Sequence, residues 1–138
     1  MKTAIVGKEA EKLAQIADCV GAVCSPCAID GETWDFLALT QDGAKAMQKV
    51  KNVQCHTLLI PDDVPISPML QAIQVVAYGF SPRDSLTVSG EGLICVQRRL
   101  ISVHGTLIEP QEILLEEPLR DLPTEQALFA VGLRLLLH

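Results

Sequence analysis

The sequence has no cluster of positive charge, no export signal and no apolar run long enough to cross a membrane. Its 138 residues include 11 Lys and Arg against 17 Asp and Glu, a net charge of −6, whereas nucleic-acid binding depends on clustered cations. Only Arg98 and Arg99 are adjacent. Residues 128–137 fall short of the roughly 20 apolar residues that a bilayer span needs. We therefore expect a cytoplasmic protein with no nucleic-acid partner and no membrane span.

Two catalytic motifs are missing as well. Gly7-Lys8 follows the first apolar run, but the upstream glycine of a phosphate loop is absent, and Glu9 stands where that loop has a Ser or Thr to hold magnesium. No Gly-x-Ser-x-Gly elbow presents a serine nucleophile to His56 or His104. These absences favour a protein without catalytic activity and without a cofactor.

Apolar residues are plentiful. Hydrophobic residues make up 49% of the chain and charged residues 20%, and a chain of this length buries roughly two thirds of its unfolded surface as one domain. The small charged fraction leaves more apolar surface than is usual for a monomer, so we expect a homo-oligomer. The five cysteines, in a chain with no export signal, are expected to be reduced and mostly buried.

Residues 1–80 have the alternating pattern of a Rossmann-like α/β layer. Short apolar runs typical of buried strands alternate with segments whose apolar residues have helical spacing. The expected strands are residues 2–6, 19–24, 34–39, 58–60 and 75–80, and the expected helices are residues 9–18 and 41–50. A compact, helix-capable segment joins the last two strands, which then form a β-crossover-β unit of a parallel sheet.

Residues 81–121 follow a different pattern. The expected strands here are residues 86–89, 93–103 and 106–115. No helix separates them, so they must pair antiparallel. A two-residue hairpin turn at His104-Gly105 would place Ile101 opposite Ile108.

Residues 122–138 are expected to form a closing helix. Its polar side chains, Gln126, Arg134 and His138, share one narrow face. Such a helix must pack between the sheet and either another helix or a second subunit, and in the second case Leu133 and Leu136 would contact the subunit. An exposed hairpin edge is the other candidate interface. Residues 1–138 as a whole are expected to form one α/β domain whose mixed sheet is parallel in its amino-terminal half and antiparallel in its carboxyl-terminal hairpins.

A candidate ligand site lies at the carboxyl ends of the predicted parallel strands, where open α/β sheets bind their ligands. Asp62 and Asp63 directly follow one strand, Tyr78 and Gly79 end the next, and Gly7 ends the first. Paired carboxylates can hold magnesium beside a substrate phosphate. Adjacent acids before a proline are also typical of a capped, solvated turn.

Cys24-Ser25-Pro26-Cys27 has the spacing of a redox pair or of half a zinc site. A complete zinc site would need two more ligands from distant segments. A reactive thiol would require Cys24 at the amino end of a helix, whereas the residues after Cys27 are typical of a loop. Structural cysteines flanking a turn are the alternative.

The order of these segments resembles the later half of the central domain of the Mur ligases, the ATP-dependent amide ligases of peptidoglycan synthesis. In that family a strand ends in an Asp-Asp-Pro-like turn, the next strand ends in Tyr-Gly, antiparallel strands follow, and a helix closes the unit. The matching segments in residues 35–138 are Asp62-Asp63-Val64-Pro65, Val75 to Phe80, the strands through Leu115, and Glu125 to Leu137.

The chain departs from the family where nucleotide binding is concerned. The family's glycine-rich loop has no counterpart, and Ile60 stands where the family has an asparagine that contacts adenine. The His-Asn pair that opens the family's closing helix is replaced by Leu122-Pro123 or Thr124-Glu125. The resemblance therefore implies the scaffold and a link to cell-envelope synthesis, but not ATP-dependent ligation.

Taken together, the sequence favours a non-catalytic binding or assembly module with a Mur-ligase-like scaffold, accessory to cell-envelope synthesis. Two alternatives remain open. One is a small thiol-redox or metal-binding protein that uses Cys24 and Cys27. The other is a protein that binds a small molecule, a nucleotide or a sugar nucleotide, in the strand-end crevice.

Overall fold

One eight-stranded sheet organises the computed structural model, which describes residues 1–138, and its strand order is β10-β7-β6-β5-β4-β3-β1-β2. A separate two-stranded sheet contains β8 and β9. The strands are β1 (Thr3–Val6), β2 (Val23–Ser25), β3 (Thr33–Leu39), β4 (Val53–Pro61), β5 (Leu70–Tyr78), β6 (Leu86–Gly90), β7 (Leu93–Val96), β8 (Leu100–Ile101), β9 (Leu107–Ile108) and β10 (Gln111–Leu114). The helices are α1 (Ala10–Ile16), α2 (Gln41–Ala46) and α3 (Thr124–Leu137), with 3-10 turns η1 (Met47–Lys49) and η2 (Leu119–Asp121). No helix combines the length and the apolar character needed to span a bilayer.

The sheet is mixed, as the sequence predicts. β2, β1, β3, β4 and β5 are parallel neighbours, whereas β6, β7 and β10 pair antiparallel. β5 and β6 run parallel but meet at one residue pair, Tyr78 and Leu86. The predicted α/β class is confirmed, and the sheet changes character near Phe80, as expected.

Helices cover both faces of the parallel half. α1 and α3 pack on one face against β-strand residues such as Phe36 and Leu59. α2 and η1 pack on the other face against Leu37 and Leu58. Strands buried on both faces have continuous apolar runs, which explains why Leu58–Ile60 is recognisable in the sequence.

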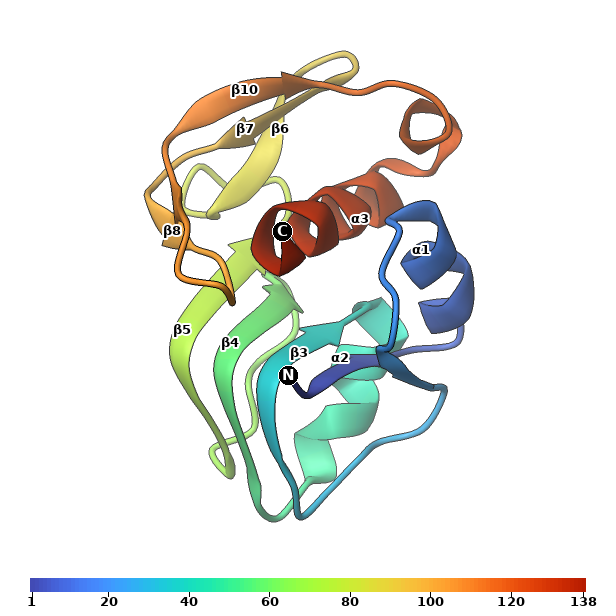
Figure 1. Cartoon of the computed structure of the whole chain (residues 1–138), viewed down its shortest axis with the longest axis vertical. Helices are drawn as coiled ribbons and strands as arrows, with labels where there is room; N and C mark the ends of the chain where they lie inside the picture. The colour runs from blue at the N-terminus through green and yellow to red at the C-terminus, as the bar shows by residue number, and fades with distance from the viewer.

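The sheet curls around α3, so that β6, β7 and β10 lie on one side of this helix and β3, β4 and β5 on another (Figure 1). Leu133 and Leu136 are fully buried, and α1 packs against α3 in the same core. Arg134, from the polar face, donates from Nη2 to the Ile16 carbonyl oxygen at 2.8 Å. The prediction that Leu133 and Leu136 contact a second subunit is therefore wrong, because this chain alone covers the helix.

The crossover between β4 and β5 contains no helix, contrary to expectation. Both strands are longer than predicted, so residues 62–69 must return almost the full length of the sheet. An extended chain covers that distance with few residues, whereas a helix rises only about 1.5 Å per residue. Pro65 and Pro68 also disfavour a helix here. Val64 and Ser67 are buried.

Several smaller predictions are wrong in their boundaries. The predicted strands 93–103 and 106–115 are each divided, into β7 and β8 and into β9 and β10. β2 begins at Val23 instead of Cys19, because Asp18 and Gly21 have positive φ and interrupt the chain. The hairpin pairs Ile101 with Leu107 instead of Ile108. Its turn is one residue longer than expected, and the Ser102 amide donates to the Thr106 carbonyl oxygen at 2.9 Å.

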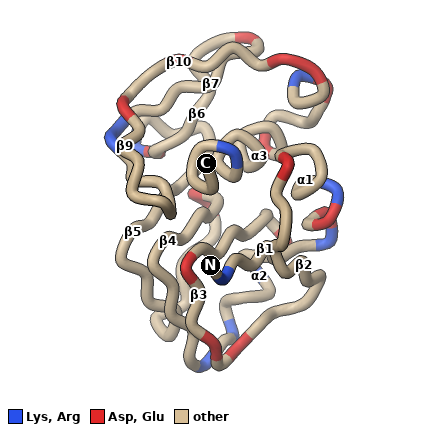
Figure 2. Tube along the Cα trace, viewed as in Figure 1, with Lys and Arg blue, Asp and Glu red and all other residues tan.

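Charged residues lie mainly in loops and near element ends, and β4 and β5 carry no Lys, Arg, Asp or Glu (Figure 2). This distribution follows from burial in β4, whose second half is covered on both faces. Burial does not explain the absence of charged residues in β5, because Gln71, Ile73 and Val75 are exposed. The exposed side of β5 is therefore uncharged without being buried.

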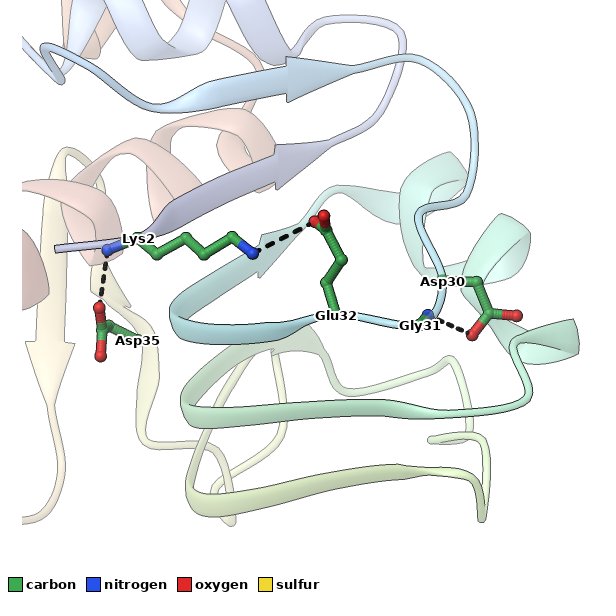
Figure 3. Close-up of polar contacts among 5 residues, drawn as sticks. All are labelled: Lys2, Asp30, Gly31, Glu32 and Asp35. Carbon is green, nitrogen blue, oxygen red and sulfur yellow. Dashed lines mark hydrogen bonds and ion pairs between the residues drawn. The ribbon is translucent and has the colours of Figure 1, made fainter.

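The loop before β3, residues 26–32, is held in place by carboxylates (Figure 3). Asp30 accepts hydrogen bonds from the backbone amides of Gly31, Lys51 and Asn52 at 2.8 to 3.0 Å. These bonds, chiefly those from Asn52 and Lys51, lower the pKa of Asp30. Asp35 accepts from the Lys2 amide at 2.6 Å. Short carboxylate-to-backbone bonds thus fasten this loop and the chain entry to β1.

Candidate functional site at the carboxyl ends of the strands

The five predicted ligand-site residues all lie at the carboxyl ends of parallel strands. Gly7 follows β1, Asp62 and Asp63 follow β4, and Tyr78 and Gly79 lie at the end of β5. The chain passes from β1 outward to β2 and then returns to β3 on the other side of β1, which makes the β1/β3 gap a topological switch point. This gap is the position where a doubly wound sheet would bind a ligand.

The switch point is filled by Thr40 and Asp42. A Cβ on Gly7 would overlap the Thr40 hydroxyl, and a Cβ on Gly43 would overlap the Val6 carbonyl. Thr40 caps α2 by accepting from the Gly43 amide at 3.2 Å. Two chain segments therefore approach too closely here to leave space for a ligand.

The amide of the β1–α1 loop that could meet an anion already has a carboxylate partner. The Lys8 amide donates to Asp42 Oδ2 at 2.8 Å, and the Thr40 hydroxyl lies 2.9 Å from Asp42 Oδ1. Burial alone would raise the pKa of Asp42, but the bonds from Lys8 and Thr40 outweigh it, and the pKa is lowered. The Lys8 amide is thus already bound by an anionic side chain, that of Asp42, and is not free to bind a phosphate.

Tyr78 forms the buried floor of the strand-end region. Its hydroxyl donates to the Leu39 carbonyl oxygen at 2.9 Å, and its ring meets Phe129 of α3 edge-on at 5.8 Å. Burial is the largest cause that raises the pKa of Tyr78, and nearby carboxylates add to it. The phenol therefore stays neutral and ties β3 to β5.

Asp62 and Asp84 form a carboxyl pair beside Gly79. A Cβ on Gly79 would overlap the Asp62 carboxyl group, which shows how closely this side chain lies on the backbone. Asp84 is buried and accepts from the Ser81 amide at 3.0 Å. Burial, followed by its contact with Asp62, raises the pKa of Asp84 to about 6. The nearby carboxyl group thus favours the protonated form of Asp84.

Sequence reasoning missed Asp84. Ser81-Pro82-Arg83-Asp84 has the residue types of a turn, and the structure does form a turn here, with the Asp84 amide donating to the Ser81 carbonyl oxygen at 3.0 Å. The pairing with Asp62 joins positions on two different strand ends. No local sequence pattern predicts a contact between carboxyl groups that are distant in the chain. An acidic turn residue directly before a buried strand does, however, indicate a candidate position.

The cavity at this edge is small and acidic. Its volume is about 100 Å³, and its lining includes Tyr78, Gln126, Asp42, Glu9 and Glu125 without any Lys or Arg. Ligand pockets usually measure roughly 300 to 1,000 Å³. The buried Oε1 atom of Gln126 has no hydrogen-bond partner. This cavity lacks both the volume and the positive charge that a nucleotide would need, and a second cavity at the same edge, of about 230 Å³, is lined by Gly7, Lys8, Glu11 and Cys24.

Asp63 has the environment of a capped turn. It is exposed and accepts from Gln41 Nε2 at 2.6 Å. No group of three or more His, Cys, Asp or Glu side chains is arranged to hold a metal ion. Asp62 and Asp63 therefore belong to no such group.

Cys24 lies in β2 and Cys27 in the following loop, so neither begins a helix, but Cys24 lines a cavity with Ala10 and Glu11 of the first turn of α1. Burial raises the pKa of Cys24, and Glu11 adds to the effect. Burial also raises the pKa of Cys19 to about 11, with Cys24 nearby. A reactive thiol requires a lowered pKa, whereas the surroundings of Cys19 and Cys24 raise it.

A larger groove, of about 410 Å³, crosses β3, β4 and β5 near their amino-terminal halves. His56 lines it, with Nδ1 at 3.0 Å from the Thr57 hydroxyl. That oxygen accepts from Gln74 Nε2 at 3.2 Å, so its own proton is free to be donated to Nδ1. The sequence did not predict this groove.

Comparison with protein-family models, curated proteins and solved structures finds no match for this chain. The resemblance to the Mur ligase central domain therefore stays a prediction.

Proposed function

We propose that this protein is a non-catalytic binding or assembly module with a Mur-ligase-like scaffold, acting in the cytoplasm as an accessory to cell-envelope synthesis. The link to cell-envelope synthesis comes from the sequence resemblance alone. The observation that carries the non-catalytic part is the filled switch point, where Asp42 binds the Lys8 amide and Thr40 occupies the space beside Gly7.

A nucleotide enzyme needs the opposite arrangement. Phosphates bind to free backbone amides near positive charge, whereas this edge presents a carboxylate already bound to the loop amide and a lining of Glu and Asp. If Asp42 moved away from the Lys8 amide to admit a ligand, the buried Thr40 hydroxyl would lose its hydrogen bond to the Asp42 carboxylate. Ligand entry would therefore have to break bonds that stabilise the α2 amino terminus.

Thermal unfolding in the presence of Mg-ATP, UDP and UDP-sugars tests the proposal. A ligand at 100 times its dissociation constant would add about 2.7 kcal/mol to the free energy of unfolding, a rise of several degrees in melting temperature for a chain of this size. We expect no rise with any of these compounds. A saturable, magnesium-dependent rise that is abolished in a Gly7→Val variant, with its fold checked by circular dichroism, would overturn the proposal.

A further inference from the structure

One side of β5 has no strand partner. β5 pairs with β4 along its whole length, but β6 meets its other side only at Tyr78. No turn or loop backbone hydrogen bond involves residues 71–77. We call the outward-facing backbone of Gln71–Ala77 the β5 edge. Its free N–H and C=O groups are open to water and form a template for another extended chain.

The β5 edge lacks the features that usually prevent edge-to-edge pairing. Protected edges carry charges, prolines or bulges, or are very short, whereas the nine residues of β5 include no charged residue, proline or glycine. The terminal strands of the sheet differ. β2 has three residues and is followed by Pro26. β10 contains Glu112 and lies between Glu109 and Glu116.

Exposed apolar side chains flank the β5 edge. Ile73 is 80% exposed and Val75 is 45% exposed. Gln74, between them, bonds through its side chain to both backbone groups of Ile101 at 2.9 and 3.0 Å. Ile101 is itself paired with Leu107, and both side chains are about half exposed. Apolar side chains are thus exposed both on the face of β5 that carries Ile73 and Val75 and on the hairpin that Gln74 binds from the opposite face.

The negative charge of the chain limits where two copies can make contact. The chain has a net charge of −6, so contact between two copies over most of their surface would bring carboxylates together. The β5 edge avoids this repulsion because β5 is uncharged and its flanking side chains are aliphatic. Two copies of the β5 edge can also satisfy each other's backbone groups.

We infer that two copies of this chain associate by antiparallel pairing of their β5 edges about a two-fold axis near Ile73. The inference rests on the proposed function, because the dimer is the assembly that such a module would make. The paired edges extend the sheet across the dimer, and Ile73 and Val75 of each copy lie beside those of the other. The interface is isologous, so each copy contributes the same residues.

Sedimentation velocity over a range of concentrations, with an Ile73→Lys variant, tests this pairing. The wild type should show a monomer–dimer equilibrium. Placing two lysines side by side at the axis should raise the dimer dissociation constant by about tenfold or more. Leu114→Lys on β10 is the matched control, since Leu114 is 67% exposed on another edge strand, and it should leave the dissociation constant unchanged.

A charge-swap experiment tests the symmetry. Ile73→Glu should weaken the dimer as Ile73→Lys does, and mixing the two variants should restore a heterodimer because opposite charges then meet at the axis. Hydrogen exchange provides a second measurement: amides of residues 71–77 should become more protected as wild-type concentration rises.

Three results would each overturn the pairing. These are a wild type that stays monomeric, a dimer that Leu114→Lys weakens as much as Ile73→Lys does, and a mixture of the charged variants that stays monomeric. None of them bears on the filled switch point, which the nucleotide measurements test separately.

Discussion

Gly7 has no room for a side chain, because the Thr40 hydroxyl occupies the space where a Cβ would lie. Its φ of 149° is also rarely adopted by residues with a side chain. The contact joins the end of β1 to the start of α2 and thereby closes the switch point. The close contact between Gly7 and the Thr40 hydroxyl therefore keeps the strand-end region filled by protein.

Gly7→Ala should destabilise the fold by about 2 kcal/mol or more, since it adds steric overlap to backbone strain. Urea unfolding followed by circular dichroism measures this loss. Gly31→Ala is the control, because Gly31 also has positive φ but has no atom within 4 Å of the position that an alanine methyl group would take. This variant should therefore lose only the stability that backbone strain costs. Equal losses in the two variants would show that Thr40 moves aside without cost.

The Asp62–Asp84 pair makes stability depend on pH in an unusual direction. The pKa of Asp84 is raised from 3.8 to about 6, so the folded protein holds a proton that the unfolded chain releases. The contribution of Asp84 to stability is therefore full below pH 3.8 and declines as the pH rises towards 6. Most paired carboxylates, including Asp30 and Asp42, have the opposite effect.

Asp84→Asn should remove this decline. The variant keeps an oxygen that can accept from the Ser81 amide, but it has no proton to exchange. We expect the wild type to lose stability relative to the variant between about pH 4 and pH 6, measured as the difference in urea unfolding free energy at each pH. A difference that stays constant across this range would mean that burial and the contact with Asp62 do not raise the pKa of Asp84.

At the scale of the element, α3 shows how one helix can be apolar in almost every direction without contacting another subunit. Sheet strands surround it on two sides and α1 packs on a third (Figure 1). Its polar stripe meets the end of α1 through Arg134. Near Gly132 the helix approaches β4 so closely that a Cβ would lie 2.8 Å from Leu59 Cδ2.

Leu136→Ala should therefore destabilise the protein by about 2 to 5 kcal/mol, the usual cost of a cavity in a packed core. It should leave the sedimentation behaviour of the folded protein unchanged. Leu137→Ala, one position along and only partly buried, should cost much less. A dimer lost in Leu136→Ala while the fold is kept would place the subunit contact on α3 after all.

The sequence allows prediction of elements wherever both faces of a strand are buried. Residues 58–60 are a continuous apolar run, but the first half of β4 alternates Val53 and Cys55 with exposed Gln54 and His56, a weaker signal. The contacts that build the strand-end site are harder to predict. Thr40 and Asp84 have ordinary local roles, a helix cap and a turn, and their contacts with Gly7 and Asp62 depend on the strand order.

At the scale of the whole molecule, two apolar cores share one sheet. The larger core includes most of α3, α1 and the carboxyl-terminal strands, and the smaller one lies under α2. This arrangement accounts for the high apolar content without an extensive oligomer interface. It also makes the carboxyl-terminal segment central to the fold, because α3 lies inside the curl of the sheet.

Removing residues 124–138 should therefore abolish cooperative folding, because Phe36, Leu59 and Leu86 on three different strands would lose the helix that covers them. Near-ultraviolet circular dichroism and urea unfolding of the truncated chain provide the measurement, and we expect neither a fixed aromatic signal nor a sigmoidal transition. Removing His138 alone, which is exposed, is the control and should leave both unchanged. A truncated chain that still unfolds cooperatively would mean that α2 and the smaller core suffice to order the parallel strands, and that α3 is an addition to a sheet which folds without it.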